Sequence, residues 1–393
     1  MSTDTVEAGS PPRESPPDPP ASGGDEWDPT SKANPARLAA GVGGMVLTGW
    51  FIANLFLAFA YYPGWFFDSK LLIGVLALIA GVGGAAVFFW FLNLAVEGLP
   101  ERVGRGVMPY AYLLPGFAAI SLMLLYPTIQ TINYSFANAD STEYVGFDNY
   151  VEIFGSSEFR STIFNNILWL LIVPAVTVAI GVVVAVLSDR LSQQGEKVSK
   201  GVIFLPMAIS FVGASAIWGL VYAYDDPGSA QTGLLNAIWT TLGGDPVTWL
   251  NTSTLRLNSL LMMVILIWLQ VGFAMILLSS AIKGVPEETL EAARIDGASE
   301  WQIFWKVVIP QIKGTIITVF ITVTILVLKV FDIVYVLTNG NFNSNVIANL
   351  FFNRLFADNQ AGQASAIVVI LLIAVLPILV YQVKHFREEE AAR

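Results

Sequence analysis

Cysteine and histidine, which supply many nucleophiles and metal ligands, are nearly absent from this chain. The sequence has no cysteine and a single histidine, His385, so it offers no thiol nucleophile, no cysteine-rich zinc site and no histidine cluster. It also lacks the pattern GxxxxGK followed by Ser or Thr, whose backbone and lysine hold nucleotide phosphates. We therefore expect no catalytic residue, no metal site and no cofactor bound by this chain itself.

A few polar side chains lie inside strongly apolar runs. Lys329 and Asp332 are three residues apart, so on a continuous helix they share a face and neutralise each other. An unpaired charge at that depth costs at least about 2.5 to 3.5 kcal/mol. Tyr335 follows one turn later, and Gln270 stands beside Trp268 in another apolar run. These side chains could line a path for a polar solute, or the charged pair could be a structural contact between spans.

A charged segment, Glu291 to Pro310, separates two further apolar runs. Pro286 suits the first turn of a helix, and Glu287 and Glu288 place negative charge at its positive end. Gly297 can adopt the left-handed conformation that ends such a helix. The sequence therefore predicts a helix that stops at a glycine turn.

A second helix is predicted directly after this glycine. Ser299 and Gln302 have capping-box spacing. Apolar residues then recur at three- and four-residue steps along one face until Pro310: Trp301, Phe304, Trp305 and Val308. The whole segment is predicted to be a helix, a glycine turn and a helix.

Composition places these segments in a membrane. Hydrophobic residues make up 55% of the 393 residues and charged residues 13%, whereas about 25% charged is usual in a soluble domain. Runs long enough to cross about 30 Å of hydrocarbon predict an all-α, polytopic membrane protein with eight transmembrane helices. They lie near residues 38–60, 71–96, 110–133, 164–188, 201–222, 258–280, 315–337 and 365–384.

The positions of the cations predict the orientation. With a cytoplasmic N-terminus, four cations outside the apolar runs fall on the external side: Lys70, Arg160, Arg256 and Arg354. The rest are cytoplasmic: Arg13, Lys32, Arg37, Arg102, Arg105, Arg190, Lys197, Lys200, Lys283, Arg294, Lys306, Lys313, Lys384, Arg387 and Arg393. This asymmetry follows the positive-inside rule, and it predicts that both termini and the loop at 281–313 are cytoplasmic.

The charged segment resembles the EAA loop of permease subunits of ABC importers. The matching residues are Glu291, Ala292, Ala293, Asp296, Gly297, Ala298, Phe304 and Pro310. Ile309 stands where leucine usually precedes the proline, a volume-conserving change. The resemblance implies that this helix docks on a cytoplasmic ATPase and passes its movement to the membrane helices. The alternative is an ordinary amphipathic hairpin on the membrane surface.

Residues 110–385 as a whole are similar to the six-helix core of the type I, binding-protein-dependent carbohydrate importer permeases. The similarity lies in the order and spacing of YAYLLPGF, FDNY at 147–150, FLPMAIS at 204–210, the loop, and FDIVYVLTNG at 331–340. The chain is then expected to comprise a disordered cytoplasmic tail at 1–36, an extra transmembrane hairpin at 37–98, this core, and a cytoplasmic tail at 386–393.

The resemblance also implies partners and a location. We expect a second homologous permease, a pair of ATPase subunits that bind ATP and Mg²⁺, an external sugar-binding protein and the lipid of the plasma membrane, with no nucleic acid. Gln270, Lys329, Asp332 and Tyr335 would then line the sugar path, and the chain itself would not be an enzyme.

The substrate is predicted only by a weaker resemblance. The runs KVFDIVYVLTNGNF, GVPEETLEAARIDGASE and HFREEEAAR are similar to the α-glucoside branch, which handles maltose, trehalose or sucrose, while other sugars, including glucose, stay open. An ion-coupled secondary transporter without an ATPase is the alternative from a different class. A membrane-embedded enzyme is disfavoured by the lack of histidine and cysteine clusters.

Overall fold

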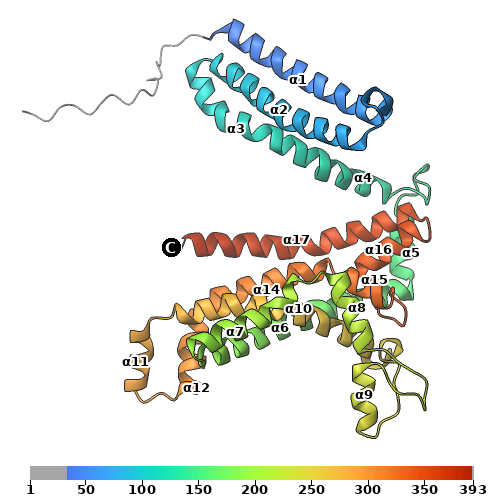
Figure 1. Cartoon of the computed structure of the whole chain (residues 1–393), viewed down its shortest axis with the longest axis vertical. Coiled ribbons are helices and arrows are strands. Elements are labelled where there is room, and N and C mark those ends of the chain that lie inside the picture. Colours follow the sequence, from blue (N-terminus) through green and yellow to red (C-terminus); the bar gives the residue numbers. More distant parts are fainter. Residues whose placement is uncertain (1–32, 392–393) are drawn as a thin grey trace, which may run out of the picture. The chain divides into compact units, whose positions relative to one another are not determined.

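The computed structural model describes residues 33–391, and its described part consists of helices joined by loops (Figure 1). One isolated antiparallel bridge joins Ala137 to Tyr144. Most of the predicted tail at 1–36 and the end of the predicted tail at 386–393 lie outside the described residues. Contacts divide the chain after Leu125 into two units, which are described separately.

The first unit is a helical hairpin followed by a third helix. Its elements are α1 (Pro35–Tyr61), the short η1 (Pro63–Phe66), α2 (Lys70–Glu97), α3 (Glu101–Ile120) and the π-helical turn η2 (Ser121–Leu125). The side chain of Asn34 accepts a hydrogen bond from Arg37 N and so caps the start of α1. A Cβ added at Gly41 would lie 2.4 Å from the backbone nitrogen of Ala95, so α1 and α2 pack too closely there for any side chain.

The second unit contains the remaining helices. They are α4 (Tyr126–Tyr134), α5 (Asp148–Gly155), α6 (Ser157–Asp189), α7 (Gln193–Phe204), η3 (Leu205–Ala208), α8 (Phe211–Val221), α9 (Leu234–Thr241), η4 (Trp249–Asn251), η5 (Thr254–Arg256), α10 (Leu257–Lys283), α11 (Glu287–Ile295), α12 (Glu300–Ile303), η6 (Phe304–Val308), α13 (Ile309–Gln311), α14 (Lys313–Leu328), α15 (Asp332–Leu337), α16 (Ile347–Phe356) and α17 (Ala361–Ala391).

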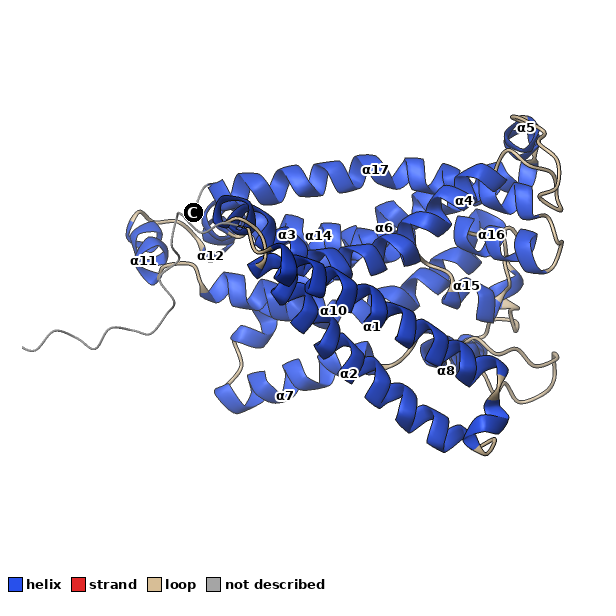
Figure 2. Cartoon of the chain, turned by 90° about the horizontal axis from the view of Figure 1, so that it is seen from above, coloured by secondary structure: helices blue, strands red, loops and turns tan. Residues whose placement is uncertain are grey.

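The core of the second unit lies where α6 packs against α10 and α14. Trp169 of α6 and Met275 and Leu278 of α10 are completely buried there. A Cβ at Gly181 would lie 2.7 Å from the Cβ of Ala274, so the small residue lets α6 and α10 approach closely. Figures 1 and 2 show α11, α12 and the C-terminal end of α17 at one end of this unit, with α5 and α16 at the other.

Six of the described helices are long and apolar enough to cross a membrane, and eight spans result if each of two bent helix pairs is one span. The first bent pair, Gln193–Ala208 with Phe211–Val221, turns by 102°. The break follows from local chemistry, because Ser210 caps the new helix by accepting a hydrogen bond from Gly213 N at 3.1 Å. The predicted span at 201–222 is therefore not one continuous helix.

The predicted span at 315–337 is also interrupted. Helix α14 ends at Leu328, and α15 begins only at Asp332. Between them, Phe331 stacks on Tyr335 and packs against Phe352 of α16, with ring centroids 5.0 Å apart in both cases. We attribute the break to this aromatic packing, because it draws Phe331 toward α16 and away from the axis of α14. The second bent pair, Glu300–Gln311 with Lys313–Leu328, turns by 68°.

Candidate functional site

The charged segment forms the predicted helix, glycine turn and helix. Helix α11 begins at Glu287, one residue later than predicted, because Pro286 is its capping residue and lies outside the first turn. The helix ends at Ile295, and Gly297 has φ +82°. The N–H of Ala298 donates to Ala293 O at 3.1 Å and so closes the turn.

The second helix starts with the predicted capping box. Ser299 Oγ accepts from Gln302 N at 3.3 Å, and Gln302 Oε1 accepts from Ser299 N at 2.9 Å. The prediction of a regular helix up to Pro310 is wrong, however. The α-helical hydrogen bonding gives way to the π-helical turn η6 (Phe304–Val308), and the helix resumes as α13 with Pro310 near its start. Because proline has no N–H to donate, the wider turn before it accommodates the missing bond.

The segment has an inner and an outer face. Val285, Ile303, Val308 and Ile312 form a buried cluster, against which Leu290, Ala293, Ala298 and Phe304 pack. The outer face of α11 carries Glu291, Ala292 and Ile295, all exposed, and the side chain of Ile295 is 86% exposed. Some motif residues, such as Ala293 and Phe304, therefore hold the segment together. Others, such as Glu291 and Asp296, are exposed.

The turn is stabilised by an ion pair that sequence spacing does not predict. Arg294 Nε donates to Glu300 Oε1 at 2.9 Å across Gly297, and both side chains are largely exposed. A six-residue separation across a turn has no helical periodicity, so no sequence signal marks this pair. The pair also flanks a cavity of about 400 Å³ between the segment and the end of α6, which Leu187 and Asp189 help to line.

The predicted path residues are partly brought together. Gln270, 5% exposed, and Asp332 line one cavity of about 490 Å³ in the second unit. Ser210 also lines it, at the break of the span that α7 and α8 form. Gln270 Oε1 is buried and has no hydrogen-bond partner within the described residues. The cavity therefore presents a carboxylate, an amide and a hydroxyl to any occupant.

Lys329 and Tyr335 do not line this cavity. Lys329 is the exposed capping residue of α14, and no ion pair joins it to Asp332, although the structure describes both side chains. The expectation that these two charges share a helical face is wrong, because the helix is interrupted between them. Tyr335 instead joins an aromatic cluster with Phe331 and Phe352.

Several membrane-crossing helices, a charged helical loop at one end and a polar cavity at a break in one span define a multi-pass membrane permease. The family described as "Binding-protein-dependent transport system inner membrane component" matches residues 177–386. The chain belongs to this family of inner-membrane transport permeases.

Curated relatives match most of the chain. It is 44% identical over 335 residues to the alpha-glucoside transport system permease protein AglF of Rhizobium meliloti (strain 1021), covering 82% of this chain and 98% of AglF. It is 45% identical over 282 residues to the osmoprotective compounds uptake permease protein GgtC of Synechocystis sp. (strain ATCC 27184 / PCC 6803 / Kazusa), covering 72% of this chain and all of GgtC (100%).

A solved structure shows the same fold. It is the crystal structure of a bacterial alginate ABC transporter in complex with an alginate pentasaccharide-bound periplasmic protein, with a TM-score of 0.61 and 22% identity. The match covers 72% of this chain and 94% of the alginate transporter chain. Broken helices also occur in secondary transporters, so the two bent pairs do not separate the classes. Family membership favours the ABC importer over the ion-coupled alternative.

Proposed function

We propose that this chain is a permease subunit of an ATP-driven importer that carries an α-glucoside, such as maltose, trehalose or sucrose, into the cytoplasm. The observation that carries this proposal is the 44% identity to AglF over 98% of that protein's length, since AglF is named for α-glucosides. The relative GgtC is named for osmoprotective compounds, so a small glycosidic solute fits both names.

The energy for transport would come from partner subunits. The sequence lacks a phosphate-binding loop of the GxxxxGK type, and the outer face of α11 presents Glu291, Ala292 and the exposed Ile295 to the surroundings. An exposed apolar residue beside a carboxylate on a short, braced helix suits docking into a groove. We infer that two ATPase subunits, which bind ATP and Mg²⁺, dock there. A second, homologous permease would complete the path.

We also propose an orientation in the membrane that suits this arrangement. The segment that carries α11 would be cytoplasmic, on the side of the C-terminal end of α17, and the opposite end with α5 would receive sugar from an external binding protein (Figure 2). Ser299→Cys tests this orientation, because the native chain has no cysteine. Labelling of this cysteine by an impermeant thiol reagent from outside intact cells would reverse the assignment.

The cavity at the broken span would be part of the sugar path. The Asp332 carboxylate and Gln270 Oε1, which has no hydrogen-bond partner among the described residues, can accept hydrogen bonds from sugar hydroxyls, and Ser210 adds a hydroxyl. Tyr335, 41% exposed, offers an aromatic face near the start of α15. ATP binding would close the ATPase pair, move the docked loop and expose this cavity alternately to the two sides.

Uptake assays test the proposed function. The complex is expressed in a strain that lacks its own α-glucoside transport and is given labelled maltose, trehalose, sucrose or glucose in separate assays. We expect saturable uptake of at least one α-glucoside that stops when ATP is depleted and persists when ion gradients are collapsed. Uptake that follows the ion gradient and ignores ATP would contradict the proposal.

A further inference from the structure

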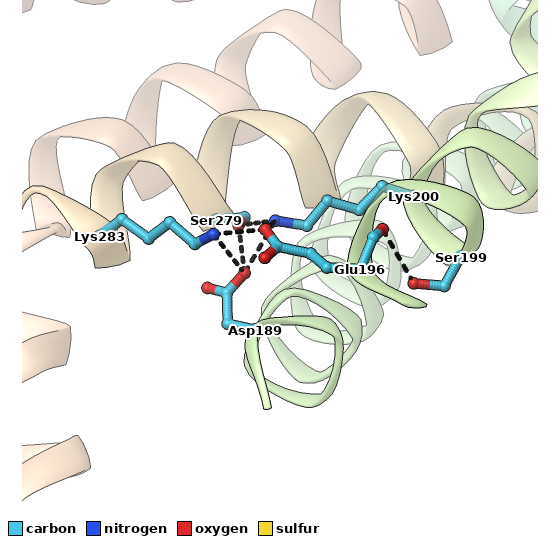
Figure 3. Close-up of polar contacts among 6 residues, drawn as sticks. All are labelled: Asp189, Glu196, Ser199, Lys200, Ser279 and Lys283. Carbon is cyan, nitrogen blue, oxygen red and sulfur yellow. Dashed lines mark hydrogen bonds and ion pairs between the residues drawn. The ribbon is translucent and has the colours of Figure 1, made fainter. Parts of the chain in front are cut away.

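Five side chains at the loop end of the second unit form one polar cluster, which Figure 3 shows. We call it the clasp. It joins Asp189 at the end of α6, Glu196 and Lys200 on α7, and Ser279 and Lys283 at the end of α10. The consecutive helices α6 and α7 and the more distant α10 thus meet at one set of charges, immediately before the segment that carries α11.

Lys200 is the centre of the clasp. Its Nζ donates to Asp189 Oδ1 at 2.7 Å, to Glu196 Oε1 at 2.6 Å and to Ser279 Oγ. A lysine ammonium has three donors, so these contacts use all of them. The Ser279 hydroxyl in turn donates to Asp189 Oδ1 at 2.7 Å. Each of the three helices therefore contributes at least one partner to a closed network.

Burial makes this network sensitive to the loss of one member. The side chains of Lys200 and Asp189 are only 19% and 15% exposed, and Asp189 Oδ2 is buried without a hydrogen-bond partner among the described residues. All close contacts of this carboxylate thus pass through Oδ1. Lys283, 51% exposed, donates its short hydrogen bond to Glu196 and reaches Asp189 only at 3.7 Å. Removing Lys200 would leave the Asp189 charge poorly compensated.

The clasp also connects the α11 segment to the cavity through the chain. Lys283 is the last residue of α10, and α11 begins four residues later at Glu287. In the other direction, α7 leads directly into η3, whose Met207 lines the cavity with Gln270 and Asp332. A Cβ at Gly272 would lie 2.5 Å from Ile203 O, so α7 is also packed tightly on α10 beyond the clasp.

We propose that Lys200 and Asp189 are positioning residues that make α7 move as one body with the loop end of α10, so that movement of the α11 segment reaches the cavity through α7. This inference rests on the proposed function, because it needs an ATPase that moves the segment. Without the clasp, α10 would still follow the segment, but the broken span that lines the cavity would lag behind it.

A cysteine reporter in the cavity tests this proposal. Met207→Cys is introduced into the cysteine-free chain, and the complete transport complex is reconstituted in lipid vesicles. The rate of labelling by a small thiol reagent is measured without nucleotide and with ATP plus vanadate. In the otherwise native chain we expect the rate to change with nucleotide. Lys200→Met should reduce that change roughly tenfold while the ATPase subunits stay bound.

Two further variants separate positioning from folding. Lys197→Met is the matched control, since Lys197 is exposed on the same helix and is not one of the five residues of the clasp, and it should keep the full nucleotide response. The double variant Asp189→Asn/Lys200→Met removes both buried charges, so protein abundance should recover to the native level while the nucleotide response stays lost. If the clasp had a purely structural role, protein abundance and the nucleotide response would recover together in the double variant.

The outcomes distinguish the two claims. If the native chain with the Met207→Cys reporter shows no response to nucleotide, the proposed ATP-driven function fails, and with it the premise of the clasp. If that chain responds, and Lys200→Met or the double variant responds equally, the proposed function stands and the positioning role of the clasp is overturned.

Discussion

Single residues decide how the loop segment is built. Gly297 has φ +82°, and a Cβ placed on it would meet no atom within 4 Å from the described residues beyond its two chain neighbours. Substitution there is therefore opposed by backbone conformation alone and not by crowding. This separates Gly297 from glycines such as Gly41, where the neighbouring backbone leaves no space.

Replacing Gly297 with Val should strain the left-handed turn by about 1 to 2 kcal/mol. We expect normal membrane insertion, weaker retention of the ATPase subunits and reduced uptake, because α11 would leave the turn at a different angle. Gly297→Asn is the matched control, since asparagine adopts this conformation more readily, and it should behave nearly as the native chain. Equal ATPase retention in the Val and Asn variants would contradict this role of the turn.

The break between α14 and α15 changes the expected effects of substituting Lys329 and Asp332. Because no ion pair joins them, Lys329→Met and Asp332→Asn should act independently, and the uptake of the double variant should equal the product of the single effects. Asp332→Asn alone should lower uptake roughly tenfold through the loss of a charged hydrogen-bond acceptor. Recovery of uptake in the double variant would show that the two charges are coupled after all.

At the scale of elements, sequence predicts the apolar helices and the loop well. Long apolar runs must form helices in lipid, because every backbone polar group needs an internal partner. The loop is predicted because Gly297 and the capping box of Ser299 and Gln302 are local signals. The break between α14 and α15 is not predicted, because it depends on Phe331 packing against Phe352 of another helix.

The cavity and the clasp are even harder to predict from the sequence. Gln270 and Asp332 could be selected as polar residues in apolar runs, but their shared cavity depends on the break of the span between α7 and α8. Lys200 and Ser279 are 79 positions apart and Ser279 and Asp189 are 90 apart. No periodicity links residues on three different helices, so only the packing of α6, α7 and α10 brings these charges together.

The hairpin of the first unit gives a prediction about element packing. Gly41→Ala places a Cβ against the Ala95 backbone, and overpacking of this kind costs about 1 to 3 kcal/mol. The unfolding temperature of the purified protein in detergent should fall. Gly43→Ala is the control, because a Cβ at Gly43 meets nothing within 4 Å. Equal unfolding temperatures for the two variants would show that α1 and α2 do not pack as described.

At the scale of the whole molecule, α7 and α10 connect the α11 segment to the cavity within the second unit. The α11 segment lies at one end with the C-terminal end of α17, and the cavity is lined where the broken span and α10 meet. The helices between them, α7 and α10, are tied by charges at the clasp and by close backbone packing at Gly272. Under the proposed function, a transport cycle driven from the α11 end would therefore reach the cavity through α7 and α10.

Glu291→Lys is the sharpest test of whether the α11 segment couples this permease to an ATPase, as we propose. Glu291 is exposed on the outer face of α11, and an unpaired charge at a docked interface costs about 2 to 5 kcal/mol. We measure how much ATPase copurifies with the tagged permease, together with sugar uptake. Glu143→Lys, an exposed charge reversal in the loop between α4 and α5, is the control.

We expect Glu291→Lys to reach the membrane at the native level, to lose the ATPase on purification and to abolish uptake, while Glu143→Lys retains the ATPase. Native ATPase retention together with native uptake in Glu291→Lys would show instead that the α11 segment is only a surface hairpin.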